Sequence, residues 1–540
     1  MIKIITGAQM QELDRRTIGE ARIPVTTLME RAGSGVVSCI EHWVGTVSGK
    51  TITLVCGKGN NGGDGFVAAR LLRRRHANVR VLAMSPLSDL SRDAASMWRQ
   101  FVKTAGKSSI FPYRSKDTAR ALLEDSDLLV DALLGTGLSS TVTGRYAEII
   151  ESMNEANRPI VAVDLPSGLH ADTGTVLGHA VRAALTVTFG LPKRGLYQNQ
   201  GIDLSGDIDL VDIGIPPPYV DALESHVTLI TPQWVQGCLP RRERSGHKGT
   251  YGHAGIIAGS LGKTGAAAMA AQAALRVGTG LVTVATPSSL NDILEAKLLE
   301  VMTLPMPETK ARTFSRAALD RLLAFMATRD AVAIGPGLST HPETVELVRA
   351  LTTRLDRPAV LDADALNALT GRAAILASCK TPPIITPHPG EMARLEADAT
   401  PQTINRDRIG TATRFARERG SFVVLKGART VIARPDGAVA ICPTGNPGMA
   451  TAGTGDVLTG MVAGFLAQGL PSWEAACTAT YLHGAAGDLA AAAKGEIGMI
   501  AGDLLEQIPT ALTKVLEYSM DRIRLAGTRP GQRHAYGSTS

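Results

Sequence analysis

Short apolar segments that end in glycine, serine or aspartate recur along this chain, and stretches with a helical pattern separate them. In the first part of the chain these segments are TITLVCG, VRVLAM, DLLVDALLG and PIVAVDLPSG, followed by ALTVTFGLPKRG. Short apolar strands that alternate with helices are typical of βαβ units. The pattern therefore predicts an α/β fold built on a parallel, doubly wound sheet.

A second series of the same kind begins after residue 244. Its strands are HAGIIAGS, LVTVATP, AVAIGPG, AVLDADAL, PIITPHPGE and FVVLKGART. Between the first two, TGAAAMAAQAALRVGTG predicts a helix of small residues, which Thr264 would cap and Gly278 would end. The second half of the chain is therefore expected to be another α/β unit, and its sequence does not repeat the first.

The length of the chain, 540 residues, is too great for one ordinary core, so we expect two domains. Pro216, Pro217 and Pro218 mark the end of the first, because proline continues neither a helix nor an inner strand. The expected domains are residues 1–218 and 245–518, joined by a linker at 219–244. The polar residues 519–540 are expected to form a disordered tail.

Composition narrows the class of protein. The net charge of +6 is mild for this length, and no basic stripe is interleaved with aromatic residues, which argues against a nucleic-acid partner. No apolar run approaches the roughly 18 residues of a membrane helix. The six cysteines form no C-x-x-C motif, so they predict no zinc site and favour a reducing, cytoplasmic location. A homo-oligomer is expected only because symmetric assemblies are common.

The glycine-rich stretch LVCGKGNNGGDGFVAARLL links the first long strand to a helix. Gly57, Gly59 and Gly62 have the spacing G-x-G-x-x-G of a dinucleotide-binding turn. That fingerprint also needs an acidic residue at the end of the second strand, but this strand ends in Ser85 and Pro86. A phosphate-binding P-loop is excluded too, because no Gly-Lys-Ser/Thr follows.

Oxygen-bearing side chains follow three strands of the first domain. Asn60, Asn61 and Asp64 follow the strand TITLVCG, Asp131 stands at the end of the strand in DLLVDALLG, and Asp164 stands at the end of the strand in PIVAVDLPSG. Because the carboxyl ends of parallel strands share one edge, these side chains could converge, and such oxygens suit a hard cation. The alternative is that Asn and Asp only form turns there.

GNNGGDG, DALLGTG and VDLPSG, in this order after two N-terminal helices, resemble the YjeF N-terminal domain family over about residues 1–215. The resemblance implies a Rossmann-like, three-layer domain that epimerises hydrated NADH and NADPH and binds potassium. It implies K⁺ ligands at Asn61, Asp131 and Ser167, and both substrate contact and proton handling for Asp164. The other implied substrate-binding residues are Asn60, Asn61, Gly62, Gly63, Asp64, Gly135, Thr136, Gly137, Leu138, Ser139, Ser140 and Thr141.

The stretch GNPGMATAGTGDVLTGMVAGFLAQG is the strongest signal of the second half. Its small residues permit close approach to a ligand, and a helix predicted from about Asp456 to Gln468 would point its N-terminus at an anion. Asp456 could either cap this helix or act as a catalytic carboxylate beside phosphate. Lys426 and Arg429 could supply positive charge, whereas His388 taken alone is more often structural.

KGTYGHAGIIAGS, AIGPGL, VLDADAL, TPHPGEMARL, VVLKGART and the glycine stretch above resemble the YjeF C-terminal domain family over about residues 240–515. The resemblance implies a ribokinase-like domain that dehydrates hydrated NAD(P)H using ADP. It implies ADP contacts at Lys426, Gly427, Ala428, Arg429, Thr430, Asn446, Gly448, Thr451, Ala452, Gly453, Thr454 and Gly455. The implied substrate contacts are Ala254, Gly337, His388, Pro389, Gly390, Glu391 and Asp456.

Together the two resemblances imply one repair pathway. The first domain would interconvert the R and S hydrates, and the second would dehydrate the S form, with phosphate transfer from ADP improving the leaving group and Asp456 as acid or base. Mg²⁺ is expected with ADP, but no residue stands out as its ligand. Two alternatives remain open here: a ribokinase-like small-molecule kinase, and a first domain that only binds nucleotides. Asp64, Asp131 and Asp164 argue against the second alternative.

Overall fold

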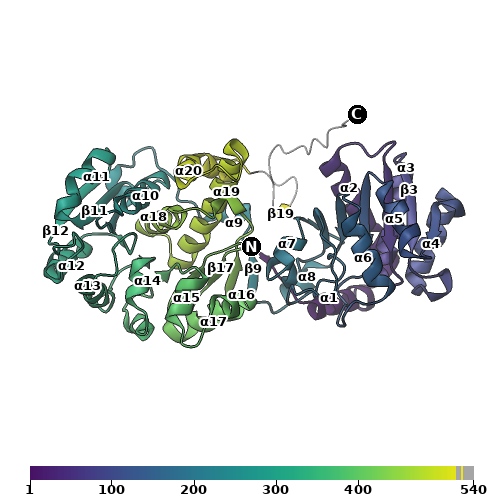
Figure 1. Ribbon diagram of the computed structural model, residues 1–540, viewed down its shortest axis with the longest axis horizontal. Coiled ribbons are helices and arrows are strands. Elements are labelled where there is room, and N and C mark those ends of the chain that lie inside the picture. The colour runs from purple at the N-terminus through teal and green to yellow at the C-terminus, as the bar shows by residue number, and fades with distance from the viewer. Residues whose placement is uncertain (519–523, 527–540) are drawn as a thin grey trace. The chain divides into compact units, whose positions relative to one another are not determined.

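The computed structural model describes residues 1–518 and 524–526, which form two compact units (Figure 1). The N-terminal unit comprises residues 2–225 together with 524–526. The C-terminal unit comprises residues 226–518 together with Met1. Figure 1 colours residues 2–225 purple to blue and residues 226–518 teal to yellow. Each unit is an α/β domain with a largely parallel sheet, as the strand pattern predicts.

The N-terminal unit has a sheet in the order β19-β8-β7-β6-β5-β2-β3-β4, parallel except for β19. The unit's strands are β1 (Ile2–Lys3), which lies outside this sheet, and β2 (Thr51–Cys56), β3 (Asn78–Ala83), β4 (Ile110–Pro112), β5 (Leu128–Ala132), β6 (Ile160–Val163), β7 (Leu185–Phe189), β8 (Asp207–Val211) and β19 (Arg524–Ala526). Its helices are α1 (Gly7–Gly19), α2 (Val25–Val44), α3 (Asn60–Arg74), α4 (Arg92–Ala105), α5 (Lys116–Glu124), α6 (Arg145–Glu155), α7 (Gly201–Leu204) and α8 (Pro217–Asp221).

Both faces of this sheet are covered, which makes the unit three-layered. Side chains of α1 to α4 pack on one face with Leu54 of β2, and side chains of α5 and α6 pack on the other with Val55. Successive strand residues point to opposite faces, so a strand buried on both sides reads as a continuous apolar run.

Local sequence sets the start of two helices that matter for the site. Thr6 Oγ1 accepts a hydrogen bond from Gln9 N at 3.2 Å, and Gln9 Oε1 accepts one from Thr6 N at 2.9 Å, so a capping box starts α1. In the glycine-rich turn, a Cβ on Gly57 would overlap the backbone of Leu133, and one on Gly62 would overlap that of Gly57. These glycines let the first turn of α3 and the end of β5 close on the end of β2.

The C-terminal unit has a sheet whose strands run in the order β9-β18-β17-β16-β15-β14-β13-β10-β11-β12. Only β17 is antiparallel to its neighbours. The strands are β9 (Val227–Leu229), β10 (His253–Ile257), β11 (Leu281–Pro287), β12 (Met302–Met306), β13 (Ala331–Ile334), β14 (Ala359–Leu361), β15 (Ile384–Ile385), β16 (Phe422–Leu425), β17 (Val431–Ala433) and β18 (Val439–Ile441).

Helices of this unit pack closely because they are rich in small residues. They are α9 (Pro232–Cys238), α10 (Thr264–Arg276), α11 (Asn291–Lys297), α12 (Leu319–Ala327), α13 (Pro342–Thr352), α14 (Asp364–Ala368), α15 (Pro389–Leu395), α16 (Pro401–Arg406), α17 (Arg408–Arg419), α18 (Thr454–Ala467), α19 (Ser472–Lys494) and α20 (Ala501–Leu516). Gly460 of α18 lies against the backbone of Ala270 of α10, so closely that a Cβ would overlap it. Lys263, not Thr264, occupies the N-cap of α10, while Gly278 follows its end with φ +103°.

The boundary regions contain regular structure. The segment expected as a linker, 219–244, includes the end of α8, strand β9 and helix α9, and the two units divide between Ser225 and His226. Within the expected tail, Arg524–Ala526 forms β19 against β8, and residues 519–523 and 527–540 lie outside the described residues.

Candidate active sites

A cavity of about 610 Å³ opens at the carboxyl ends of β2, β5, β6 and β7 in the N-terminal unit. Ten of the residues singled out in the sequence line this cavity: Asn60, Asn61, Asp64, Gly135, Thr136, Gly137, Leu138, Ser139, Ser140 and Asp164. Gly62 and Gly63 are buried in α3 behind the wall, and Thr141 is exposed beyond the loop. The strand-end positions thus meet as the parallel topology requires.

A buried lysine organises the floor of this cavity. Lys193 is 0% exposed, and its Nζ donates to Asp164 Oδ1 at 2.5 Å, to the Phe189 carbonyl oxygen at 2.8 Å and to Thr188 Oγ1 at 3.2 Å. Asp164 has φ +69°, a strained value for a residue other than glycine. A strained backbone conformation persists where neighbouring groups fix the residue, and here the hydrogen bond from Lys193 Nζ fixes the side chain of Asp164.

Two further carboxyl groups line the same cavity. Burial raises the pKa of Asp14 to about 6, and Asp14 Oδ1 has no hydrogen-bond partner among the described residues. Burial also raises the pKa of Asp64 well above its ordinary value, with added repulsion from Asp164 and Asp14 and a smaller opposing effect from Lys193. Asp14 was not recognisable in the sequence, and Lys193 was not singled out although it stands in the quoted segment ALTVTFGLPKRG.

Asp131 and Ser167 lie together beneath the cavity, near Asn61. Asp131 is 0% exposed and accepts hydrogen bonds from Ser167 N at 2.7 Å, Ser167 Oγ at 2.6 Å and Leu133 N at 3.2 Å. Asn61 Nδ2 donates to the Leu134 carbonyl oxygen at 3.0 Å, but Asn61 Oδ1 is buried with no partner in the described chain. Burial raises the pKa of Asp131 to about 6, although the hydrogen bonds from Ser167 and Leu133 oppose the rise.

A second cavity, of about 450 Å³, opens at the carboxyl ends of β10, β13, β14 and β15 in the C-terminal unit. Its lining residues are Gly262, Lys263, Gly265, Ala266, Gly337, Ala363, Asp364, Asn367, His388, Glu391, Arg394 and Asp456. Ala254 is not among them: it is fully buried near the amino end of β10, at the opposite edge of the sheet. Pro389 and Gly390 form the first turn of α15 beside the cavity.

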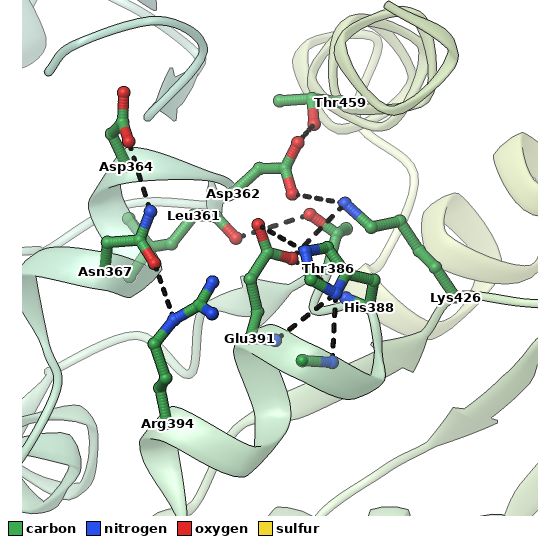
Figure 2. Close-up of polar contacts among 11 residues, drawn as sticks. Leu361, Asp362, Asp364, Asn367, Thr386, His388, Glu391, Arg394, Lys426 and Thr459 are labelled. Atoms are coloured by element: carbon green, nitrogen blue, oxygen red, sulfur yellow. Dashed lines mark hydrogen bonds and ion pairs between the residues drawn. The ribbon is translucent and has the colours of Figure 1, made fainter. Parts of the chain in front are cut away.

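Lys426 lies between buried carboxylates next to this cavity (Figure 2). Its Nζ lies 2.7 Å from Asp362 Oδ1 and 3.8 Å from Glu391 Oε2, and Thr459 Oγ1 donates to Asp362 Oδ2 at 2.7 Å. Asp362 is 1% exposed. The lysine therefore neutralises the site's own carboxylates, and its expected contact with phosphate stays a prediction.

Asp456 stands in the first turn of α18, next to this charge cluster. The helix begins at Thr454, two residues earlier than the sequence suggested, and its N-cap is Gly453 with φ +95°. Asp456 therefore does not cap the helix. Burial raises the pKa of Asp456 to about 7, with repulsion from Asp362 adding to it and Lys426 opposing it. A carboxyl group near neutrality can both give and take a proton at physiological pH.

His388 has a structural task in this site. Its Nδ1 accepts hydrogen bonds from Gly390 N at 3.0 Å and Glu391 N at 3.3 Å, which caps α15, and burial lowers its pKa. Glu391 Oε2 in turn accepts from His388 N at 2.9 Å. The capping box presents Glu391 toward Lys426.

The residues expected to cradle ADP fall in two neighbouring loops. Lys426 to Thr430 follow β16, and Asn446 to Gly455 lead into α18. The loops meet where Gly455 faces Lys426: a Cβ at that glycine would lie 3.3 Å from Nζ. Arg429, with φ +54°, donates to the Pro443 carbonyl oxygen, and Asn446 Nδ2 donates to Asp488 Oδ1 at 3.0 Å.

A buried arginine that the sequence did not single out holds the first of these loops. Arg408 is 6% exposed, and its guanidinium donates to the Leu425 carbonyl oxygen at 2.8 Å and to the Ala428 carbonyl oxygen. No acidic side chain forms an ion pair with it within the described ranges. Burial lowers the pKa of Arg408 to about 10, so the guanidinium still carries its charge at neutral pH. Because no carboxylate of the described residues pairs with it, this positive charge beside the loop is unbalanced.

Other polar residues of the second cavity were also missed. Asp364 Oδ2 accepts from Lys263 Nζ at 3.0 Å and from Ser339 N at 2.8 Å, and its Oδ1 accepts from Asn367 Nδ2 at 3.1 Å. Asp362 and Asp364 stand in the quoted motif VLDADAL, so the signal was present, but nothing in the spacing alone separated these aspartates from turn formers.

Two family models match the chain. One, described as the N-terminus of YjeF-related proteins, matches residues 25–195, and the other, described as NAD(P)H-hydrate dehydratase, matches residues 254–510. Over the described residues, no helix is long and apolar enough to cross a membrane, and no group of three or more His, Cys, Asp or Glu residues could hold a metal ion.

Curated relatives match almost the whole chain. A bifunctional NAD(P)H-hydrate repair enzyme of Moorella thermoacetica is 48% identical and covers 97% of this chain and 99% of its own length. Enzymes of the same name from Salinibacter ruber and Escherichia coli are 39% and 35% identical, over 94% and 86% of this chain and 95% and 84% of their own lengths.

One solved structure is similar to the C-terminal unit. It is an ADP/ATP-dependent NAD(P)H-hydrate dehydratase of Bacillus subtilis, co-crystallised with ATP and Mg²⁺. It is 32% identical, with 54% of this chain and 99% of that chain covered and a TM-score of 0.48.

Proposed function

The chain belongs to the family of bifunctional NAD(P)H-hydrate repair enzymes, and from that membership we propose which residues carry each of its two activities. As a member it is an NAD(P)H-hydrate epimerase and an NAD(P)H-hydrate dehydratase in one chain. The relatives span the full length of both units, which displaces the two alternatives of a fused small-molecule kinase and a non-catalytic N-terminal module.

The 610 Å³ cavity is the proposed epimerase site. Asn60, Asn61, Asp64 and the loop from Gly135 to Thr141 would surround the hydrated nicotinamide ring. The observation that carries the assignment is Asp164, which combines a strained backbone, an ion pair to a fully buried lysine and access to the cavity. These features are those of a group held ready for proton transfer.

Asn61, Asp131 and Ser167 are the proposed ligands of K⁺. The fit rests on the buried, unpaired Oδ1 of Asn61 and on the buried charge of Asp131, both of which a cation would satisfy. K⁺ would supply positive charge that anchors the loop after β5. Its residues do the rest: Ser167 Oγ accepts from Leu134 N at 2.9 Å and so ties that loop to the end of β6.

Replacing K⁺ by choline at constant ionic strength is expected to lower both the epimerase rate and the melting temperature of the N-terminal unit. A ligand present at 100 times its Kd stabilises a fold by about 2.7 kcal/mol. The measurement is thermal unfolding and epimer exchange across a K⁺ titration. Asn61→Ala should remove the K⁺ response and the matched surface variant Asn78→Ala should keep it. An equal response in both variants would reject Asn61 as a ligand.

The second cavity and the adjoining loops are the proposed dehydratase site. Gly337, His388 to Glu391 and Asp456 would face the S hydrate, and the loops 426–430 and 446–455 would face ADP. The free N–H groups at the start of α18 and the unbalanced charge of Arg408 favour phosphate there. Ala254 remains a proposed contact on resemblance alone, because its burial supports no direct role.

We propose that phosphate transfer from ADP to the ring hydroxyl makes it a good leaving group. Asp456 then takes the ring proton whose loss, together with the departure of phosphate, restores the ring double bond. Lys426 and the backbone of α18 would stabilise charge that develops on the phosphate. Mg²⁺ is expected with the nucleotide, and no group of three or more His, Cys, Asp or Glu residues in the described part of the chain is arranged to hold a metal ion by itself.

Arg408→Met is expected to raise the KM for ADP by roughly tenfold to a hundredfold, with a smaller change in kcat. Hydrogen bonds from a charged group contribute about 1.5–3 kcal/mol each, and Arg408 holds the loop through two carbonyl oxygens. The measurement is dehydratase kinetics at varied ADP. Arg417→Met, on the exposed side of the same helix, is the matched control. An unchanged KM for ADP would remove Arg408 from the account.

All six cysteines are free thiols, which supports a reducing compartment such as the cytoplasm as the proposed location. A homo-oligomer stays a prediction.

A further inference from the structure

The epimerase cavity holds more acid–base groups than one proton transfer needs. Three carboxyl groups, those of Asp14, Asp64 and Asp164, line it together with Lys193. Lys193 forms its ion pair with only one of them, Asp164, at 2.5 Å. The three carboxyl groups therefore sit in unequal surroundings, although they face one space.

Epimerisation of the hydrate requires an acid and a base at the same time. C6 of the hydrated ring carries both the hydroxyl group and a bond to the ring nitrogen, so it is a hemiaminal carbon. To invert it, an acid protonates the hydroxyl as the C6–O bond breaks and the nitrogen lone pair forms a C=N⁺ bond. Water then adds to the other face, the pair returns to nitrogen, and a base takes one proton from that water. No oxidant or reductant is consumed.

We propose that Asp64 in its neutral form is the acid and Asp164 as carboxylate is the base, and that Lys193 is the positioning residue that keeps the two in opposite states. The inference rests on the proposed placement of the hydrate in this cavity. After one inversion Asp64 is ionised and Asp164 protonated, and transfer of that proton across the cavity resets both. For the opposite epimer the same steps run in reverse, as an enzyme that interconverts two forms requires.

The electrostatics of the cavity agree with this division. Burial and the negative neighbours Asp164 and Asp14 favour a neutral Asp64, and the ammonium of Lys193 stabilises negative charge on Asp164. Pairs of titratable groups whose surroundings push them apart define acid and base roles in other enzymes. The remaining titratable groups that face the cavity are Lys58 and Tyr146.

In the proposed scheme Asp14 transfers no proton of its own. It lies on α1, and its pKa is raised to about 6, so it is largely ionised above neutral pH. There its charge disfavours ionisation of Asp64, which keeps the acid neutral over a wider pH range.

The test is the pH dependence of epimer exchange, followed by chromatographic separation of the R and S hydrates and corrected for the spontaneous rate. Asp64→Asn is expected to lower the rate by roughly 10²- to 10⁴-fold at every pH. Lys193→Ala is expected to move the acidic limb of the profile up by about one to three pH units, because Asp164 loses the opposite charge beside it.

Chemical rescue separates this role from a merely structural one. Ethylammonium added to Lys193→Ala should restore the acidic limb, and ethanol, of similar size but without charge, should not. Lys116→Met, which removes a surface lysine paired with Glu151, is the matched control and should keep the wild-type profile. Melting curves of each variant report whether the N-terminal unit stays folded.

The outcomes divide cleanly. The acid–base division would be overturned by wild-type rates for Asp64→Asn. It would also be overturned by a Lys193→Ala profile that is lower but neither shifted nor rescued. In both cases the loss of exchange in Asp164→Asn would show that the proposed site itself still holds. Wild-type exchange in Asp164→Asn itself would instead reject the proposed site.

Discussion

Asp456→Asn is expected to lower the rate of dehydration by roughly 10²- to 10⁴-fold, the usual loss when an acid–base group is removed. The asparagine keeps the size of the side chain and its place in the first turn of α18, so the loops that precede the helix should stay in position. Epimerisation should continue at the wild-type rate, because its proposed residues all belong to the N-terminal unit. Recovery of absorbance at 340 nm from the S hydrate with ADP measures the loss.

The pH dependence of stability gives an independent check on Asp456. Its folded pKa of about 7 lies above its ordinary value, so the stability it contributes is complete below that ordinary value and declines as pH rises toward 7. Asp456→Asn should therefore melt at a higher temperature than the wild type at pH 8, and the difference should narrow at pH 5. Asp320→Asn, at the exposed start of α12, should change neither activity nor this trend. Near-normal dehydration in Asp456→Asn would contradict its role.

Lys426→Met should strongly lower the rate of dehydration and also destabilise the C-terminal unit by about 3–5 kcal/mol. The lysine is the cation shared by Asp362 at 2.7 Å and Glu391 at 3.8 Å, and its loss leaves buried carboxylates without an opposite charge. It also opposes the rise in the pKa of Asp456, so the remaining activity should shift to higher pH.

A double variant separates the loss of fold from the loss of chemistry. Lys426→Met combined with Asp362→Asn removes both charges of the closest pair, so it should recover part of the stability and none of the dehydratase activity. The measurements are thermal unfolding of all three variants and dehydratase assays, with epimerisation as the internal control. If the double variant regained activity together with stability, Lys426 would be structural only.

Five strands of the first half, β2, β3, β5, β6 and β7, were predictable because each is a short apolar run closed by a turn residue, whereas β4 and β8 were not foreseen. β2, β3, β5 and β6 lie where TITLVCG, VRVLAM, DLLVDALLG and PIVAVDLPSG placed them. In the second half, β17 and β18 are only three residues each, and their antiparallel course depends on pairing with β16, which no local pattern contains. Their addition to the sheet was not foreseen.

Some site residues could likewise be found from the sequence, and others could not. Asp64 was visible because it stands among the glycines that follow β2, and Asp164 because it directly follows β6. Asp14 and Lys193 were not, because the first is one polar position of an amphipathic helix and the second lies in the exit loop of β7. Only the tertiary fold, which places α1 and the loop after β7 at the same cavity, brings these two residues together. Lys426 was found for its charge, but its partner Asp362 comes 64 positions earlier in the chain, a distance over which sequence spacing carries no information.

The central claim, that two separate sites in this chain together return both hydrates to NAD(P)H, is tested most directly by absorbance at 340 nm on a mixture of R and S NADPH hydrate with ADP and Mg²⁺. We expect full recovery by the wild type, rapid recovery of only the S fraction by Asp164→Asn, and recovery slowed by roughly 10²- to 10⁴-fold by Asp456→Asn. Full, rapid recovery by Asp164→Asn, or any rapid recovery by Asp456→Asn, would contradict it.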